Sequence, residues 1–215
     1  MSGLINSYTP QYGVSFTWQT ASTGAGYSPA LLNTTGNYLK WMLSGDVAAP
    51  VTLFGVQSAT HNLSTNTGTA QIDVLGKNGF VGLTSIHFYQ TDGVSSFVFN
   101  NPINSLDTLH FSSQQINTVA TIDLTNVPNI TTLDIRDQKW TTIDLSGNAL
   151  LTYVDIWSNL LPSGEVDQVI IDLDGHGLSN GTLNYDAQAD PTAASLTAYN
   201  SLISKGWTIT GAVPV

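Results

Sequence analysis

Cysteine and charged residues are the two kinds of residue most notably scarce in this chain. None of its 215 residues is Cys, which excludes disulfide bonds and thiolate metal sites. Charged residues make up only 9% of the sequence, against roughly 25% in an ordinary soluble domain. Basic residues are rarest, with 5 Lys and Arg against 15 Asp and Glu and a formal net charge of −10. This balance argues against binding to nucleic acid and against docking to an anionic membrane.

Long apolar runs are missing as well. No stretch approaches the about 18 consecutive apolar residues of a membrane-spanning helix, so we expect no insertion into a membrane. The first ten residues have neither the basic nor the apolar segment of a secretory signal, which predicts synthesis in the cytoplasm without export. Apolar residues still account for 41% of the chain, which is enough for a globular core.

Motifs of catalysis are absent too. The sequence contains no G-x-S-x-G, no H-E-x-x-H and no phosphate-binding glycine loop. Glu165 is the only glutamate, so a glycosidase carboxylate pair would have to consist of Asp residues. A calcium loop starting at Asp172 would need a bidentate carboxylate at its twelfth position, which is Leu183. We therefore expect no catalytic residue, no metal site and no cofactor, and we interpret residues 172–177 as a helix-ending turn.

What the chain does have is a recurring phrase, L-x-x-L-x-I/F, whose copies start at residues 83, 106, 130 and 151. These spacings lie within the period range of leucine-rich repeats. A second apolar phrase follows within the units, at residues 97–99, 122–124 and 143–145. Because one unit cannot bury its apolar face alone, the units must stack. The phrase predicts parallel strands whose buried residues are Leu83, Ile86, Phe88, Leu106, Leu109, Phe111, Ile130, Leu133, Ile135, Leu151, Val154 and Ile156.

Residues 1–77 alternate between apolar and polar rather than repeat. Short alternating or apolar runs lie at residues 14–18, 38–43, 51–56 and 69–75, separated by segments rich in Gly, Asn and Thr. Strands of this length and spacing are typical of an all-β sandwich.

Motifs in this segment resemble those of polycystic-kidney-disease-like (PKD) domains, which are immunoglobulin-type sandwiches. The matching order is Trp41 before Ser44-Gly45-Asp46, then Thr60-His61, then a strand from Gly68 to Val74. Those domains carry W-x-F-G-D-G, T-H-x-Y and G-x-Y-x-V at these places. Ser44, Val47 and Asn62-Leu63 depart from that pattern. The resemblance implies an immunoglobulin/PKD-like fold for residues 1–77.

Residues 130–148 resemble the leucine-rich repeats of Bacteroidota surface proteins and of phages of that group, with their L-T-x-L-D-L…I-D-L-S-x-N pattern. Helical spacing of apolar residues over 166–173 and 196–203 predicts two C-terminal helices, which would cap the array. The expected fold class is therefore β-rich. An N-terminal immunoglobulin/PKD-like β-sandwich (1–77) would serve for attachment, and a short parallel-β leucine-rich-repeat solenoid with helical C-terminal units would follow (78–215).

Alternation places the residues between the buried positions on the concave face of the solenoid. Aromatic and Arg side chains dominate binding hot spots, and Trp or Tyr can stack on sugars. The expected ligand-binding residues are Tyr153, Trp157, Arg136, Asp134, Asp155, His110 and Tyr89. The alternative is that Tyr153 and Trp157 pack against each other or against a neighbouring loop, such as residues 160–162, and belong to the core.

Two further sets of residues contain side chains that can bind metal ions. His87 and His110 should be neighbours on adjacent strands, but no third ligand accompanies them. An Asp also follows an apolar residue at four repeat positions, for which surface solubility and turn hydrogen bonds are the expected roles. These four residues are Asp123, Asp134, Asp144 and Asp155.

The sequence thus suggests a non-enzymatic structural or adhesive protein on the surface of a phage virion, either a head decoration or a fibre protein. Its N-terminal domain would bind other capsid or fibre proteins, and its repeats would bind a host-surface or mucosal glycan or protein. A homo-oligomer is compatible with this role. The alternatives are a Bacteroidota cell-surface adhesin or another protein-binding repeat module, and a hydrolase with clustered concave carboxylates.

Overall fold

A computed structural model of the protein describes residues 12–20, 30–34, 39–45, 51–54, 70–77, 82–88, 94–111 and 121–215. For the strands before residue 78, Ser44 excepted, and for residues 94–97, the description covers the backbone alone. The described part of the chain is mostly β-strand with two α-helices, as the sequence indicates. None of its helices has the length and apolarity needed to cross a membrane.

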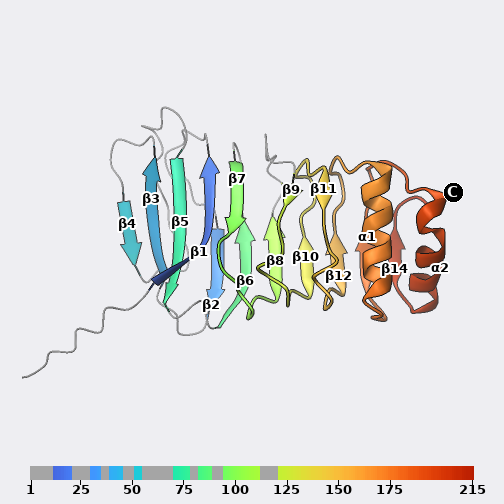
Figure 1. The fold of residues 1–215 in the computed structure, drawn as a ribbon, viewed down its shortest axis with the longest axis horizontal. Helices are drawn as coiled ribbons and strands as arrows, with labels where there is room; N and C mark the ends of the chain where they lie inside the picture. Colours follow the sequence, from blue (N-terminus) through green and yellow to red (C-terminus); the bar gives the residue numbers. More distant parts are fainter. Residues whose placement is uncertain are drawn as a thin grey trace, which may run out of the picture.

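Figure 1 shows the strands side by side in a row, with both helices at the C-terminal end. The helices are α1 (Ser163–Gly175) and α2 (Leu196–Ser204), the latter preceded by the 3-10 turn η2 (Ala193–Ser195). The strands are β1 (Tyr12–Thr20), β2 (Ala30–Thr34), β3 (Leu39–Gly45), β4 (Val51–Phe54), β5 (Ala70–Lys77), β6 (Leu83–Phe88), β7 (Val94–Phe99), β8 (Thr108–Phe111), β9 (Thr121–Ile122), β10 (Thr132–Asp134), β11 (Thr142–Ile143), β12 (Tyr153–Asp155), β13 (Thr182–Asn184) and β14 (Thr208–Thr210).

The repeated phrase forms one parallel sheet. Strands β6, β8, β10, β12, β13 and β14 pair in parallel, and β2 completes the seven-stranded sheet antiparallel to β6. The pairing aligns the central apolar residue of each phrase, so that Leu133 lies between Leu109 and Val154. All twelve residues expected in the core are buried. The sequence prediction of stacked, parallel, laterally paired strands is confirmed.

The second apolar phrase forms the other side of the core. Ile122 in β9 pairs in parallel with Ile143 in β11, and this two-stranded sheet shares one buried cluster with the parallel sheet. Aromatic rings pack together within that core, where Phe111 stacks on Phe88 with 4.5 Å between centroids. Phe111 also meets the fully buried Trp140 edge-on at 6.0 Å. Such ring pairs add to the free energy gained from the apolar area they bury.

Asparagine side chains connect each unit to the unit before it. Nδ2 of Asn126 donates to the carbonyl of Phe99 at 2.6 Å, and Nδ2 of Asn148 donates to the carbonyl of Val127 at 2.9 Å. Each amide satisfies a carbonyl that would otherwise lie at the core boundary without a partner. Asn148 closes the second phrase of its unit, and Asn126 makes the equivalent bond from one position earlier in the preceding unit.

The C-terminal helices lie where the sequence predicts them. Helix α1 buries Val166, Val169, Ile170 and Leu173, the i, i+3, i+4, i+7 face. It ends before Gly177, whose φ of 73° suits a glycine, so the interpretation of residues 172–177 as a helix-ending turn is confirmed.

Strand pairing crosses the expected domain boundary at residue 77. Strand β2 joins the parallel sheet through β6, and β7 joins the five-stranded antiparallel sheet of order β4-β3-β5-β1-β7. Without β2, the edge of β6 would present unpaired backbone groups. Each of the two segments, 1–77 and 78–215, therefore contributes a strand to a sheet formed mainly by the other. The division into two domains stays a prediction.

Candidate functional site

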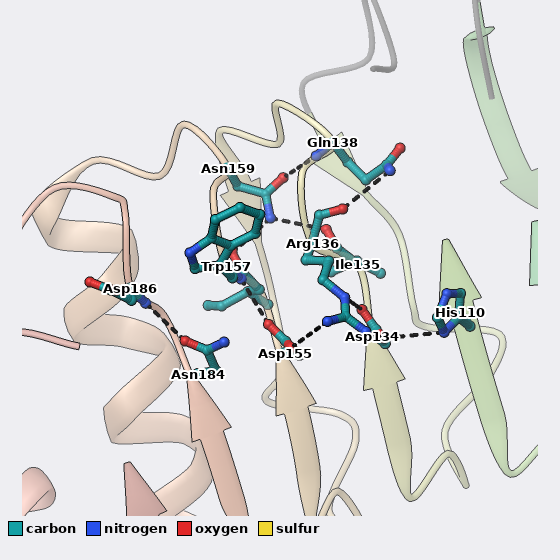
Figure 2. Close-up of polar contacts among 11 residues, drawn as sticks. His110, Asp134, Ile135, Arg136, Gln138, Asp155, Trp157, Asn159, Asn184 and Asp186 are labelled. Carbon is teal, nitrogen blue, oxygen red and sulfur yellow. Dashed lines mark hydrogen bonds and ion pairs between the residues drawn. The ribbon is translucent and has the colours of Figure 1, made fainter. Parts of the chain in front are cut away.

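The parallel register lines up polar side chains on the face of the seven-stranded sheet that points away from the core. Adjacent strands align His87, His110, Asp134, Asp155 and Asn184, which we call the polar row. A second row beside it aligns Thr132, Tyr153 and Thr182. Figure 2 shows the polar row from His110 to Asn184 at the ends of β8, β10, β12 and β13. Ligands commonly bind at the carboxyl ends of parallel strands, because the loops that follow converge there.

Arg136 interacts with two carboxylates of the polar row, Asp134 and Asp155. Its Nε lies 3.0 Å from Asp134 Oδ1 and its Nη2 lies 2.6 Å from Asp134 Oδ2, a bidentate pair. Its Nη1 lies 3.6 Å from Asp155 Oδ2. On the other side of Asp134, His110 Nδ1 lies 3.1 Å from Oδ2. One guanidinium therefore bridges two carboxylates on neighbouring strands.

Burial and pairing act against each other on these ionisable groups. Burial pushes the pKa of Asp134 upward, but hydrogen bonds from His110 and Arg136 and their charges outweigh it, so the pKa lies below its ordinary value. The hydrogen bond to Asp134 raises the pKa of Arg136. The Arg136–Asp134 pair is therefore fully ionised at neutral pH, with Asp134 only 4% exposed.

Two aromatic side chains stand beside this pair. Tyr153 is 37% exposed and Trp157 is 39% exposed, so the expectation that both project into solvent is confirmed. Neither belongs to the core, and Leu160, in the loop expected to cover Trp157, is itself 60% exposed. The pKa of the Tyr153 phenol is raised by partial burial and then by the charges of Asp155 and Asp134, which places it within electrostatic reach of the row.

The loops that follow the strands have a constrained backbone. Trp157 N–H donates to Asp155 Oδ1 at 3.1 Å, and Asp186 N–H donates to Asn184 Oδ1 at 3.3 Å. Strands β12 and β13 thus each end in a turn closed by the strand's own polar-row side chain. Four residues in these loops have positive φ without being glycine, a conformation that is concentrated at functional sites. They are Asp137, Lys139, Ser158 and Ala187.

A buried Asn, which sequence reasoning missed, fixes the positions of Arg136 and Trp157. Asn159 Oδ1 accepts N–H groups from Gln138 and Trp140, each at 3.1 Å. Its Nδ2 donates to the carbonyls of Ile135 and Ile156. Three of these bonds join the loop after β12 to the segment that follows β10, and the bond to Ile156 closes the loop after β12 on itself. The signal in the sequence that could have identified Asn159 was a polar residue at a position that is buried between stacked units.

The remaining expected site residues fall into two groups. Figure 2 shows that His110, Asp134, Arg136, Asp155 and Trp157 come together. Tyr153 interacts electrostatically with Arg136 and both carboxylates, whereas Tyr89 lies outside the described residues. His87 stacks on His110 with 5.3 Å between centroids, and burial followed by the proximity of His110 lowers its pKa. Within the described ranges, no group of three His, Asp or Glu side chains is arranged to hold a metal ion.

The four repeat Asp residues divide between the two sheets. Asp123 and Asp144 are exposed and accept the N–H of Thr125 and Ser146 respectively, each at 2.9 Å, as turn-forming residues do. The expectation of surface solubility is wrong for Asp134 and Asp155, which are 4% and 5% exposed. Arg136 lies across both carboxylates and explains this burial, because a paired carboxylate can leave water at much lower cost.

A cavity of about 600 Å³ lies beside the turns that follow β9 and β11, away from the polar row. Its lining includes Asp123 and Asp144, whose carboxylates are engaged in those turns.

No protein-family model, curated protein or solved structure matches this chain. The geometry of the polar row and its two aromatic residues therefore defines the candidate site.

Proposed function

We propose that the protein is a non-enzymatic binding protein whose ligand site consists of Tyr153, Trp157 and Arg136 on the outer face of the parallel sheet. The observation that carries this proposal is the exposure of two large aromatic side chains beside a guanidinium that two buried carboxylates hold in place. Aromatic and Arg side chains supply most of the binding free energy at known interfaces. A rigid site also loses little side-chain entropy on binding.

A glycan or host-surface protein is the proposed ligand. Indole and phenol rings offer flat faces for stacking on sugars, and the Thr, Asn and Arg side chains of the two rows offer hydrogen-bond partners for hydroxyl groups. The fold proposed for this part of the chain is a short leucine-rich-repeat solenoid, supported by the parallel register and by the inter-unit asparagine bonds.

The proposed setting is the surface of a phage particle, as a head decoration or fibre protein. An immunoglobulin/PKD-like N-terminal domain would bind other virion proteins there, and the repeats would project outward. The resemblance of residues 130–148 to repeats of Bacteroidota phages and a surface poor in charge support this setting. The same resemblance extends to Bacteroidota surface proteins, so a cell-surface adhesin is the second candidate.

Replacing Trp157 tests the site directly. The full chain and its Trp157→Ala variant are compared on an array of neutral and acidic glycans and on host cells. We expect the variant to lose at least ten-fold in affinity while its melting temperature stays within a few degrees, because the ring is outside the core. Leu160→Ala, which removes another exposed apolar side chain nearby, is the matched control. Binding that survives in Trp157→Ala argues against the site.

Fractionation tests the setting. Mass spectrometry of purified phage particles and of outer-membrane fractions from the same culture should find the chain in the particles. Recovery from the membrane fraction alone would favour the cell-surface adhesin.

A further inference from the structure

We infer that this site selects an uncharged oligosaccharide of at least two sugar units and discriminates against sialylated or sulfated glycans. The inference rests on the proposed function and adds the class of ligand. It follows from the charges around Arg136 and from the spacing of the two aromatic side chains.

Arg136 has no uncompensated charge to offer an anionic sugar. Asp134 takes two of its N–H groups in a bidentate pair, and Asp155 faces a third nitrogen at 3.6 Å. Because an Arg–carboxylate pair is fixed in geometry, an incoming carboxylate or sulfate would have to displace Asp134 or share its partner. Asp134 cannot retreat, because its side chain is also within 3.1 Å of His110 and is almost fully buried.

The loops around the site add further negative charge. Asp137 and Asp186 follow β10 and β13, and Lys139 is the other cation of these loops. Together with Asp134 and Asp155, these loops place more carboxylates than cations at this end of the sheet. Lys205, in the C-terminal unit, pairs with Asp174 at 2.6 Å. An anionic ligand would meet like charges here, which is an effective means of rejecting a competitor.

Hydroxyl groups find suitable partners in the same place. An Arg carries five N–H donors, and those of Arg136 that do not face the carboxylates remain for a ligand. Thr132 and Thr182 flank Tyr153 on the two neighbouring strands, and Asn184 continues the polar row. Hydroxyl and amide groups both donate and accept, as sugar hydroxyls do. Uncharged Thr and Asn side chains are thus available for hydrogen bonds with sugar hydroxyls, while the electrostatic potential around them is negative.

The spacing of the aromatic side chains sets the minimum length of the ligand. Tyr153, Asp155 and Trp157 alternate on the same face, and hydrogen bonds from Ile156 and Ser158 to the next unit continue the pairing beyond β12. Tyr153 and Trp157 lie on either side of Asp155 along the chain, and the strand from Tyr153 to Asp155 alone spans about 7 Å. A ligand that contacts both aromatic side chains must therefore pass over Asp155, which an oligosaccharide lying along β12 can do and a single pyranose ring cannot.

The experiment measures binding of the full chain to matched glycans by calorimetry and on an array. The probes are N-acetyllactosamine oligomers of one to four disaccharide units, maltooligosaccharides from glucose to maltohexaose, and sialylated and sulfated forms of the same lactosamines. We expect the neutral forms to bind at least ten-fold more tightly than their acidic counterparts. Glucose alone should bind at least ten-fold more weakly than the oligomers.

The outcomes separate the inference from the proposed function. Equal or tighter binding of a sialylated or sulfated glycan at Trp157 overturns the inference and leaves the binding site standing. Equal affinity for glucose and for its oligomers overturns the length requirement, and with it the inference. A folded protein that binds none of these glycans overturns the inference, whereas the proposed function fails only if Trp157→Ala also leaves binding to host cells unchanged.

A charge variant tests the cause of the discrimination. Asp155→Asn keeps an oxygen for the Trp157 N–H and removes one of the two charges beside Arg136, so the ratio of neutral to acidic affinity should fall several-fold. Asp144→Asn, on the two-stranded sheet, should leave the ratio unchanged. Because Asp155 is buried, its variant is compared only if it unfolds cooperatively. A second measurement uses the wild-type protein alone. Raising the salt concentration screens the field and should narrow the same ratio. An unchanged ratio in high salt overturns the inference.

Discussion

Asp134 and Asp144 stand in the same repeat, each between two buried aliphatic residues, but they lie on different sheets. Asp134 belongs to the seven-stranded sheet, where it is buried beneath Arg136 and contacts His110. Asp144 follows β11 in the two-stranded sheet, where it is exposed and accepts hydrogen bonds from the backbone and side chain of Ser146. The two sheets therefore use the same local sequence differently, one for a charge network across strands and the other for a local turn.

This difference comes from the neighbouring units rather than from the repeat itself. On the seven-stranded sheet, the adjacent strands bring His110 on one side and Asp155 on the other, and Arg136 lies between the two carboxylates. On the two-stranded sheet, the aligned neighbour of Asp144 is another acid, Asp123, which has its own turn. On the seven-stranded sheet a guanidinium compensates two aligned carboxylates, which can therefore be buried. The aligned carboxylates of Asp123 and Asp144 each accept hydrogen bonds from their own turn and face water.

Breaking the core that the two sheets share should have the largest effect. Leu133 is fully buried between Leu109 and Val154, and Leu133→Ala should lower the free energy of unfolding by about 2–5 kcal/mol because it leaves a cavity. Urea unfolding followed by tryptophan fluorescence measures this. Leu150→Ala removes an exposed Leu side chain and should cost much less. Equal losses in the two variants would contradict the repeat packing.

Removing each Asp should then separate the two sheets. Asp134→Ala should cost about 1.5–3 kcal/mol, since it removes charge-assisted hydrogen bonds and leaves Arg136 without its main partner. Asp144→Ala should cost about 0.5–1.5 kcal/mol, the range for ordinary hydrogen bonds, because its turn is open to water. Chemical unfolding at neutral pH measures both. If Asp144→Ala is the more costly, the polar row does not stabilise its sheet.

The periodic part of this molecule could be predicted from the sequence, and its cross-strand part could not. The buried phrase residues and the exposure of Tyr153 and Trp157 follow from alternation along each strand, which is a local property. The pairing of β2 with β6 links segments about fifty residues apart and has no local signal. The burial of Asp134, Gln138 and Asn159 depends on hydrogen-bond partners that only stacked units provide. The location of the candidate site could therefore be predicted from its aromatic residues. The hydrogen bonds that hold those residues in place could not be predicted.

The smallest expected effect concerns the far end of the polar row, where pH should distinguish His87 from the turn carboxylates. Burial lowers the pKa of His87, the neighbouring His110 lowers it further, and Asp134 opposes both. A histidine with a lowered pKa takes up its proton more readily in the unfolded chain, so folding stability rises with pH between its folded pKa and the unfolded value of about 6.5. The wild-type protein should therefore lose a little folding stability when the pH falls from 7 to 5.5. The carboxylates of Asp123 and Asp144 stay ionised in this range, because hydrogen bonds from Thr125 and Ser146 lower their pKa values. His87→Gln should flatten that slope, as measured by urea unfolding at several pH values, whereas Asp144→Asn should not. An unchanged slope in His87→Gln would show that the imidazole stack does not disfavour protonation of His87.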